Sequence, residues 1–102
     1  MIMPNDKPWY QKGSKIADAL EDLKTVSDGK TLLDAKTKEL IKFVVASLSR
    51  CDHCTTSHLK KALAAGATKE ELTEALLVGA LQTAATQMNW DKATFERYLG
   101  EK

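Results

Sequence analysis

Residues 68–88, TKEELTEALLVGALQTAATQM, decide the fold class of this chain. Thr68 followed three positions later by Glu71 is the signature of a capping box, which satisfies unpaired backbone amides at the start of a helix. The helix that begins there is predicted to run from Lys69 to about Met88. Its middle is apolar on nearly every side, so several of its faces need cover. In a chain of 102 residues, a second copy is the expected cover.

The remaining sequence also favours helices, because both prolines lie within the first eight positions and none follows. Helices are predicted over residues 14–27 and 34–49, and from the cysteine-containing segment to Ala65, where Gly66 occupies the usual C′ position. Asp91 is expected to cap a last short helix. Five side chains of the 34–49 helix are expected to be buried: Leu40, Ile41, Val44, Val45 and Leu48.

These patterns predict an all-α fold, a single small helical domain over residues 1–102 with four to five helices that forms oligomers. Charged residues make up 28% of the chain and hydrophobic residues 43%, which is ordinary for a globular protein. Fifteen basic residues balance fourteen acidic ones and are spread along the chain. We therefore expect no nucleic-acid partner.

The N-terminal sequence MIMPNDKPWYQKG lacks the basic start and apolar run of a signal peptide. The longest nearly apolar window, residues 75–85, is too short to span a bilayer and is interrupted by Gln82. We therefore expect no membrane association and a cytoplasmic location. Thiols are kept reduced there, so a close cysteine pair is more often catalytic or metal-binding than a permanent crosslink.

Residues 49–58, SRCDHCTTSH, hold both cysteines and both histidines of the chain. A c-type haem needs a histidine directly after the second cysteine, but that position is Thr55. Zinc prefers cysteine and histidine ligands, yet structural zinc sites usually gather ligand pairs from two separate segments. This chain has no second pair. Zinc is therefore disfavoured here, and dithiol chemistry remains the better interpretation.

A Cys-x-x-Cys pair at a helix start lies beside unpaired backbone amides and the positive end of the helix dipole. That environment stabilises thiolate, the nucleophile toward both peroxides and disulfides. At spacings of three and four residues, Cys51, Cys54 and His58 share one helix face. His58 is expected to act as a base or proton donor to the thiols. His53 points elsewhere, and either assists Cys51 or faces solvent.

The pattern Glu39, eleven residues, Cys51-x-His53-Cys54, three residues, His58 resembles the alkylhydroperoxidase D-like branch of the carboxymuconolactone decarboxylase family. The resemblance covers about residues 33–88, the core of that family. A Cys-x-x-Cys pair alone is weak evidence. The full histidine and cysteine cluster, with a glutamate twelve residues before it, is specific.

The resemblance implies an all-helical homo-oligomer, a trimer or hexamer, with thiol peroxidase or disulfide reductase activity in an antioxidant role. No cofactor or metal is implied. Glu39 would orient and charge His58, which would exchange a proton with the thiols. Judged alone, Glu39 would be a solvated helix charge. Decarboxylases of the wider family generally lack the cysteine pair, which argues against that activity.

In the expected mechanism, one thiolate attacks the peroxide and becomes a sulfenic acid, and the other thiol condenses with it to form a Cys51–Cys54 disulfide. A dithiol reductant, a lipoyl protein or a thioredoxin-like protein, restores the pair. Cys54 is expected to be peroxidatic because it lies one turn before His58, and Cys51 is expected to meet the reductant. The alternatives are a decarboxylase-like enzyme and a redox-sensing or metal-binding oligomeric module.

Overall fold

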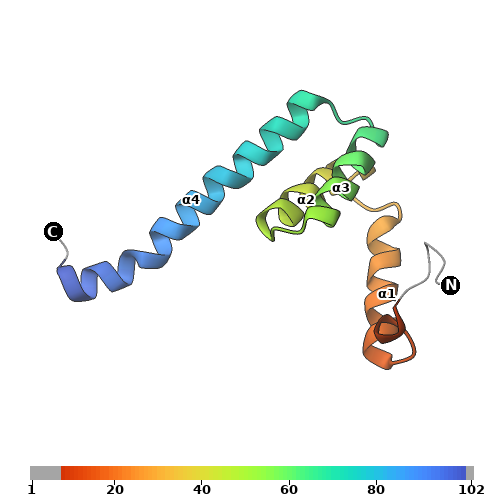
Figure 1. Ribbon diagram of the computed structural model, residues 1–102, viewed down its shortest axis with the longest axis horizontal. Coiled ribbons are helices and arrows are strands. Elements are labelled where there is room, and N and C mark those ends of the chain that lie inside the picture. Colours follow the sequence, from red (N-terminus) through yellow and green to blue (C-terminus); the bar gives the residue numbers. More distant parts are fainter. Residues whose placement is uncertain (1–7, 101–102) are drawn as a thin grey trace. The chain divides into compact units, whose positions relative to one another are not determined.

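The computed structural model describes residues 8–100, and this part of the chain is helical without strands (Figure 1). A short 3₁₀ helix, η1 (Trp9–Gln11), precedes α1 (Lys15–Asp28), α2 (Ala35–Leu48), α3 (Asp52–Ala64) and α4 (Lys69–Leu99). The chain divides into two compact units at Asp34, so η1 and α1 belong to the first and α2 to α4 to the second. The all-α prediction is confirmed. None of the described helices is both long and apolar enough to cross a membrane.

In the first unit, hydrogen bonds cap both ends of α1. The Ser14 hydroxyl accepts a hydrogen bond from the Ala17 amide at 3.1 Å and so satisfies one of the unpaired amides at the helix start. At the other end, the Gly29 amide donates to the Val26 carbonyl at 3.2 Å. The helix therefore begins and ends within one residue of its predicted limits.

The core of the second unit lies where α2 and α3 pack side by side and α4 begins (Figure 1). Phe43 from α2 packs with Ala62 from α3, which is fully buried, and with Leu72 from α4. The small Ala62 side chain allows a close approach of the two helices. Further apolar side chains pack against this cluster: Leu40, Val44 and Leu59. The side chains that precede and follow the cysteine segment thus fix α3 against α2.

Gly79 allows α4 to approach α2 closely. A Cβ atom at this position would lie 2.5 Å from Val44 Cγ1. Glycine inside a helix costs about 1 kcal/mol relative to alanine. Replacing an exposed helix glycine with alanine would therefore stabilise the fold by about that amount. Here the added methyl group meets a β-branched side chain that is stiff at χ1 within a helix. The contact therefore requires the two helices to move apart.

We expect Gly79→Ala to lower the free energy of unfolding by about 1 kcal/mol, because overpacking outweighs the gain in helix propensity. Chemical denaturation followed by circular dichroism measures this change. In a Val44→Ala background the same substitution should become neutral or stabilising, since the clash is gone. Destabilisation of equal size in both backgrounds would show that the close contact is not the cause.

Glu71 joins two parts of the second unit. One carboxylate oxygen accepts from the Thr68 backbone amide at 3.0 Å, and Thr68 Oγ1 accepts from the Glu71 amide at 3.0 Å, which completes the predicted capping box. The other oxygen accepts from Lys36 Nζ on α2 at 2.8 Å. The Lys36 hydrogen bond, followed by that of the Thr68 amide, lowers the pKa of Glu71 from its ordinary value of 4.5.

A lowered pKa in the folded state means that ionised Glu71 stabilises the fold above pH 4.5, and that this contribution is lost as the pH falls through the lowered folded-state value. We expect the denaturation midpoint of Glu71→Gln to fall less than that of the wild type between about pH 6 and about pH 3. Glu70→Gln, which changes the exposed neighbouring carboxylate, is the matched control. A pH dependence of Glu71→Gln equal to that of the wild type would refute this assignment.

Two sequence-based predictions about the helices are wrong. The helix predicted to end near Met88 continues to Leu99, so Asp91 does not cap a separate helix. No glycine or proline interrupts this segment, and Gln87 Nε2 donates to Asp91 Oδ2 one turn later at 3.0 Å. The expected burial also fails at three positions, since Ile41, Val45 and Leu48 are about half exposed.

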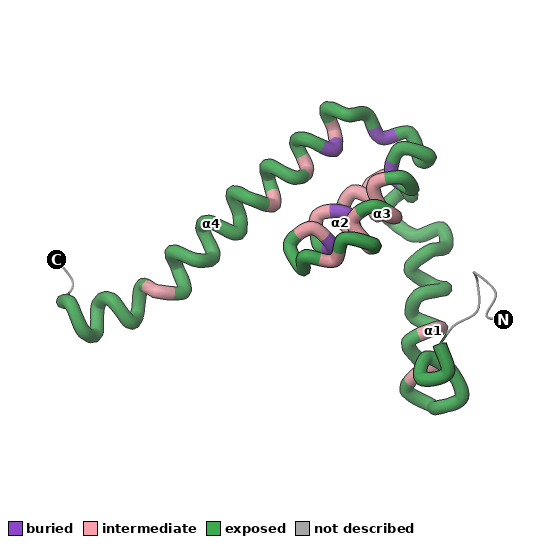
Figure 2. The backbone as a smooth tube through the Cα atoms, viewed as in Figure 1, coloured by how far each residue is buried: buried purple, intermediate pink, exposed green. Residues whose placement is uncertain are grey.

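The uncovered apolar surface has a structural reason. The core cluster that α2 forms with α3 and α4 includes Phe43 but none of the three exposed residues. Figure 2 shows that α4 is exposed along nearly its whole length. Leu72 is its one buried residue, whereas Leu77, Val78 and Leu81 are each more than 60% exposed. Oligomer formation therefore remains a prediction that this surface motivates.

Candidate active site

The backbone reverses sharply between α2 and α3 and so places Cys51 at the start of α3. The Cys51 amide donates to the Ala46 carbonyl and the Arg50 amide to the Ser47 carbonyl, both at 3.1 Å. These two bonds form a Schellman motif, whose C′ residue is left-handed and usually glycine. Here that residue is Arg50, with φ of 58°. A side chain in this conformation costs roughly 1–2 kcal/mol, so strained backbone directly precedes the cysteine pair.

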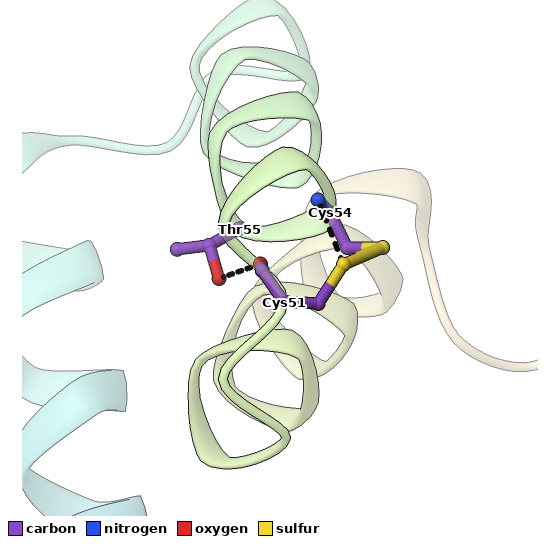
Figure 3. The surroundings of a disulfide bond; sticks show 3 residues. All are labelled: Cys51, Cys54 and Thr55. Atoms are coloured by element: carbon purple, nitrogen blue, oxygen red, sulfur yellow. Dashed lines mark hydrogen bonds between the residues drawn. A yellow bond between two sulfur atoms is a disulfide. The ribbon is translucent and has the colours of Figure 1, made fainter.

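Cys51 is the N-cap residue of α3. Its Sγ accepts a hydrogen bond from the Cys54 amide at 3.3 Å, and the same two residues are joined by a disulfide with their Cα atoms 5.3 Å apart (Figure 3). The Thr55 hydroxyl donates to the Cys51 carbonyl at 2.7 Å and fixes the first turn. Once the bond is reduced, the free amides and dipole of this helix start would stabilise a thiolate.

Glu39 on α2 and His58 on α3 meet across the interface between these helices. Glu39 Oε2 lies 2.7 Å from His58 Nδ1, and the two side chains are only 15% and 23% exposed. A carboxylate can only accept, so Nδ1 carries the hydrogen and donates it. The other ring nitrogen, Nε2, is thereby left to accept a proton from a thiol, and it becomes a donor only once it has done so. Partial burial strengthens this interaction relative to a surface pair.

A pocket of about 360 Å³ brings the cysteine pair and His58 together. α2 supplies its other wall, which is mostly apolar. The pocket is lined by Ile41, Lys42, Val45, Ala46, Ser49, Cys51, Cys54 and His58. Glu39 contacts this pocket through His58 and through Lys42, whose Nζ lies 3.6 Å from Glu39 Oε1.

Four of the five predicted site residues therefore converge at one place: Glu39, Cys51, Cys54 and His58. His53 is exposed on the first turn of α3 and does not line the pocket. Lys42 was not predicted, although its position three residues after Glu39 on a helix would have indicated the contact. Between residues 8 and 100, no group of three or more histidine, cysteine or acidic side chains is arranged to hold a metal ion.

Comparisons with known proteins agree with this architecture. Residues 15–93 match the carboxymuconolactone decarboxylase family. A curated protein of Paracoccus denitrificans, described as uncharacterized protein 4 in the cox locus, is 40% identical over 68 residues, or 67% of this chain. The match spans about 61% of that relative's length. A crystal structure of a protein from Methanobacterium thermoautotrophicum superposes with a TM-score of 0.71 at 33% identity and covers 83% of this chain and 98% of that one.

Proposed function

The chain belongs to the carboxymuconolactone decarboxylase family, and we propose that it is a thiol-dependent redox enzyme that reduces peroxides or disulfides in an antioxidant role. One observation carries the proposal. The Glu39–His58 hydrogen bond ends at a pocket that also holds the Cys51–Cys54 pair. A dithiol supplies two electrons, and an imidazole held by a carboxylate supplies and removes protons. Together these groups suffice for the reaction without a further cofactor.

In the peroxidase reaction, His58 Nε2 takes the proton of the Cys54 thiol, and the resulting thiolate attacks one peroxide oxygen and breaks the O–O bond. The alkoxide that leaves takes a proton from His58 Nε2 and departs as an alcohol, while Cys54 becomes a sulfenic acid. The Cys51 thiol then attacks the Cys54 sulfur, which releases water and forms the disulfide. The two sulfurs lose two electrons in total, and the peroxide gains them.

We assign the attacking role to Cys54 because it lies one helical turn before His58. Glu39 does not touch the substrate in this scheme. It holds the imidazole in one tautomer and orientation through the hydrogen bond to Nδ1. Cys51, at the junction of the loop and α3, is the sulfur that an external dithiol would attack to reopen the disulfide. We propose a lipoyl protein or a thioredoxin-like protein as that reductant. His53 is exposed beside Cys54 and would contribute only to the electrostatic potential near the thiols.

We also propose that the protein acts as a homo-oligomer, a trimer or hexamer, in the cytoplasm. The apolar surface that the chain leaves exposed, chiefly on α4, supports the proposal of a homo-oligomer. A surface of this extent is typical of an interface between subunits.

The proposal is tested by mixing the reduced full-length protein with tert-butyl hydroperoxide and, separately, with oxidised lipoamide in a stopped-flow instrument. We expect rapid loss of two thiols per chain with at least one of these oxidants. Reaction with the peroxide identifies a peroxidase, and reaction with lipoamide alone identifies a disulfide reductase. If both thiols survive both oxidants, the dithiol enzyme is wrong, and turnover of a muconolactone would then favour the decarboxylase alternative.

A further inference from the structure

Lys42 is placed to control the carboxylate that holds His58. It lies on α2 one helical turn after Glu39, and its Nζ is 3.6 Å from Glu39 Oε1. The second oxygen, Oε2, is the one that meets His58 Nδ1 at 2.7 Å. Each oxygen of Glu39 thus faces a different nitrogen. Lys42 also lines the pocket that contains the cysteine pair.

We propose that Lys42 is a positioning residue for the thiol chemistry, an inference that rests on the proposed function. Its ammonium group attracts Oε1 of Glu39 and thereby turns Oε2 toward His58. Lys42 acts through Glu39 and does not touch the sulfurs in this scheme. A carboxylate rotates freely about its terminal bond unless both oxygens are held, so one hydrogen bond to His58 leaves its orientation less defined.

The geometry indicates an electrostatic interaction and not a hydrogen bond, because 3.6 Å is too long for an N–H···O contact. The Glu39 side chain is 15% exposed and that of Lys42 is 32% exposed, so solvent screens this pair less than a surface pair. Lys42 therefore has a stronger influence on Glu39 than an ordinary helix lysine has on a neighbour.

Other charged groups near the site are exposed or already paired. On α3, Asp52 and His53 flank the cysteines but are exposed. On α4, both carboxylate oxygens of Glu71 are occupied, Oε2 by Lys36 Nζ and Oε1 by the Thr68 amide. Among the described residues that line the pocket, Lys42 is the one with a permanent positive charge. Its removal is therefore expected to change the site more than removal of any other lysine.

The test measures how readily the reduced thiols react, without relying on turnover. The full-length reduced protein is treated with iodoacetamide across a pH series, and alkylation of each cysteine is followed by mass spectrometry. The variants are Lys42→Met, Lys42→Arg and, as a matched control, Lys60→Met, which removes an exposed lysine from α3. Each variant is also made in a Glu39→Gln background, because a residue that acts through Glu39 loses its influence there.

We expect Lys42→Met to move the midpoint of the alkylation profile upward by about half a pH unit, since a less well held His58 stabilises the thiolate less. Lys42→Arg should restore the wild-type profile, and Lys60→Met should not change it. In the Glu39→Gln background the Lys42→Met shift should fall to less than about a third of that value. An unchanged profile for Lys42→Met overturns the proposal, and so does an equal shift in both backgrounds.

The same proteins separate this inference from the proposed function. If the alkylation shifts occur as expected but the wild type reduces neither tert-butyl hydroperoxide nor lipoamide, the proposed function fails while the role of Lys42 in positioning Glu39 stands. If the wild type turns over and Lys42→Met alkylates like the wild type, the function stands and the role of Lys42 is refuted.

Discussion

Replacing Cys54 with serine is expected to reduce the rate of peroxide consumption to that of the uncatalysed reaction, a loss of at least about 10³-fold. The serine hydroxyl cannot become a thiolate, so no sulfur adjacent to His58 remains to attack the peroxide. The fold should persist, because the backbone amide at position 54 can still donate to the N-cap side chain. Stopped-flow kinetics with the reduced variant measures the loss.

The companion variant Cys51→Ser distinguishes the two sulfurs. It retains the attacking cysteine but cannot form the disulfide, so we expect one rapid turnover that stops at a sulfenic acid on Cys54. Trapping with dimedone and mass spectrometry detects this product. Thr56→Ala, a change at an exposed position of α3, controls for perturbation of the helix. If Cys54→Ser instead accumulates the sulfenic acid on Cys51, the roles of the two cysteines are reversed.

Glu39→Gln is expected to slow thiol oxidation by about 10²-fold at neutral pH, the lower end of what general acid–base groups contribute. Glutamine preserves the size of the side chain but carries no charge, so it accepts a weaker hydrogen bond from His58 Nδ1. It can also present its amide nitrogen to the ring and favour the wrong tautomer. The rate of thiol oxidation, measured across a pH series, should be lower for Glu39→Gln than for the wild type.

The matched control for this change is Glu70→Gln, which removes an exposed carboxylate from α4. Its rate should equal that of the wild type. Thermal denaturation of both variants separates a catalytic effect from a loss of folding. Wild-type kinetics in folded Glu39→Gln would show that the hydrogen bond to His58 is structural only, and would leave the dithiol to act without a proton relay.

Local sequence patterns predicted the helix starts well. The spacing of Thr68 and Glu71 forms the expected capping box, and Gly66 adopts the left-handed conformation expected after α3. The Cys-x-x-Cys spacing correctly indicated a helix start, where Cys51 is the N-cap. These features depend on backbone amides within a few residues of the side chain that satisfies them, so the sequence contains all the information that they require.

Features that depend on contacts between helices could not be predicted in this way. Glu39 and His58 lie nineteen residues apart, and helical periodicity does not identify which of many carboxylates meets the histidine. The family resemblance supplied that pair. Arg50 carries no signal for its left-handed backbone, because glycine usually occupies this position. Ile41 and Val45 were predicted to be buried, but both are exposed. Helical periodicity identifies an apolar face and does not say whether the same chain covers it.

The N-cap hydrogen bond of α3 links the first turn of this helix to the oxidation state of the cysteine pair. The acceptor that holds the first turn of this helix is Cys51 Sγ, an atom of the disulfide itself. Reduction exchanges a neutral disulfide sulfur for a thiol or thiolate, and a charged acceptor binds an amide more strongly than a neutral one. The oxidation state of the cysteine pair is therefore coupled to the stability of the first turn of α3.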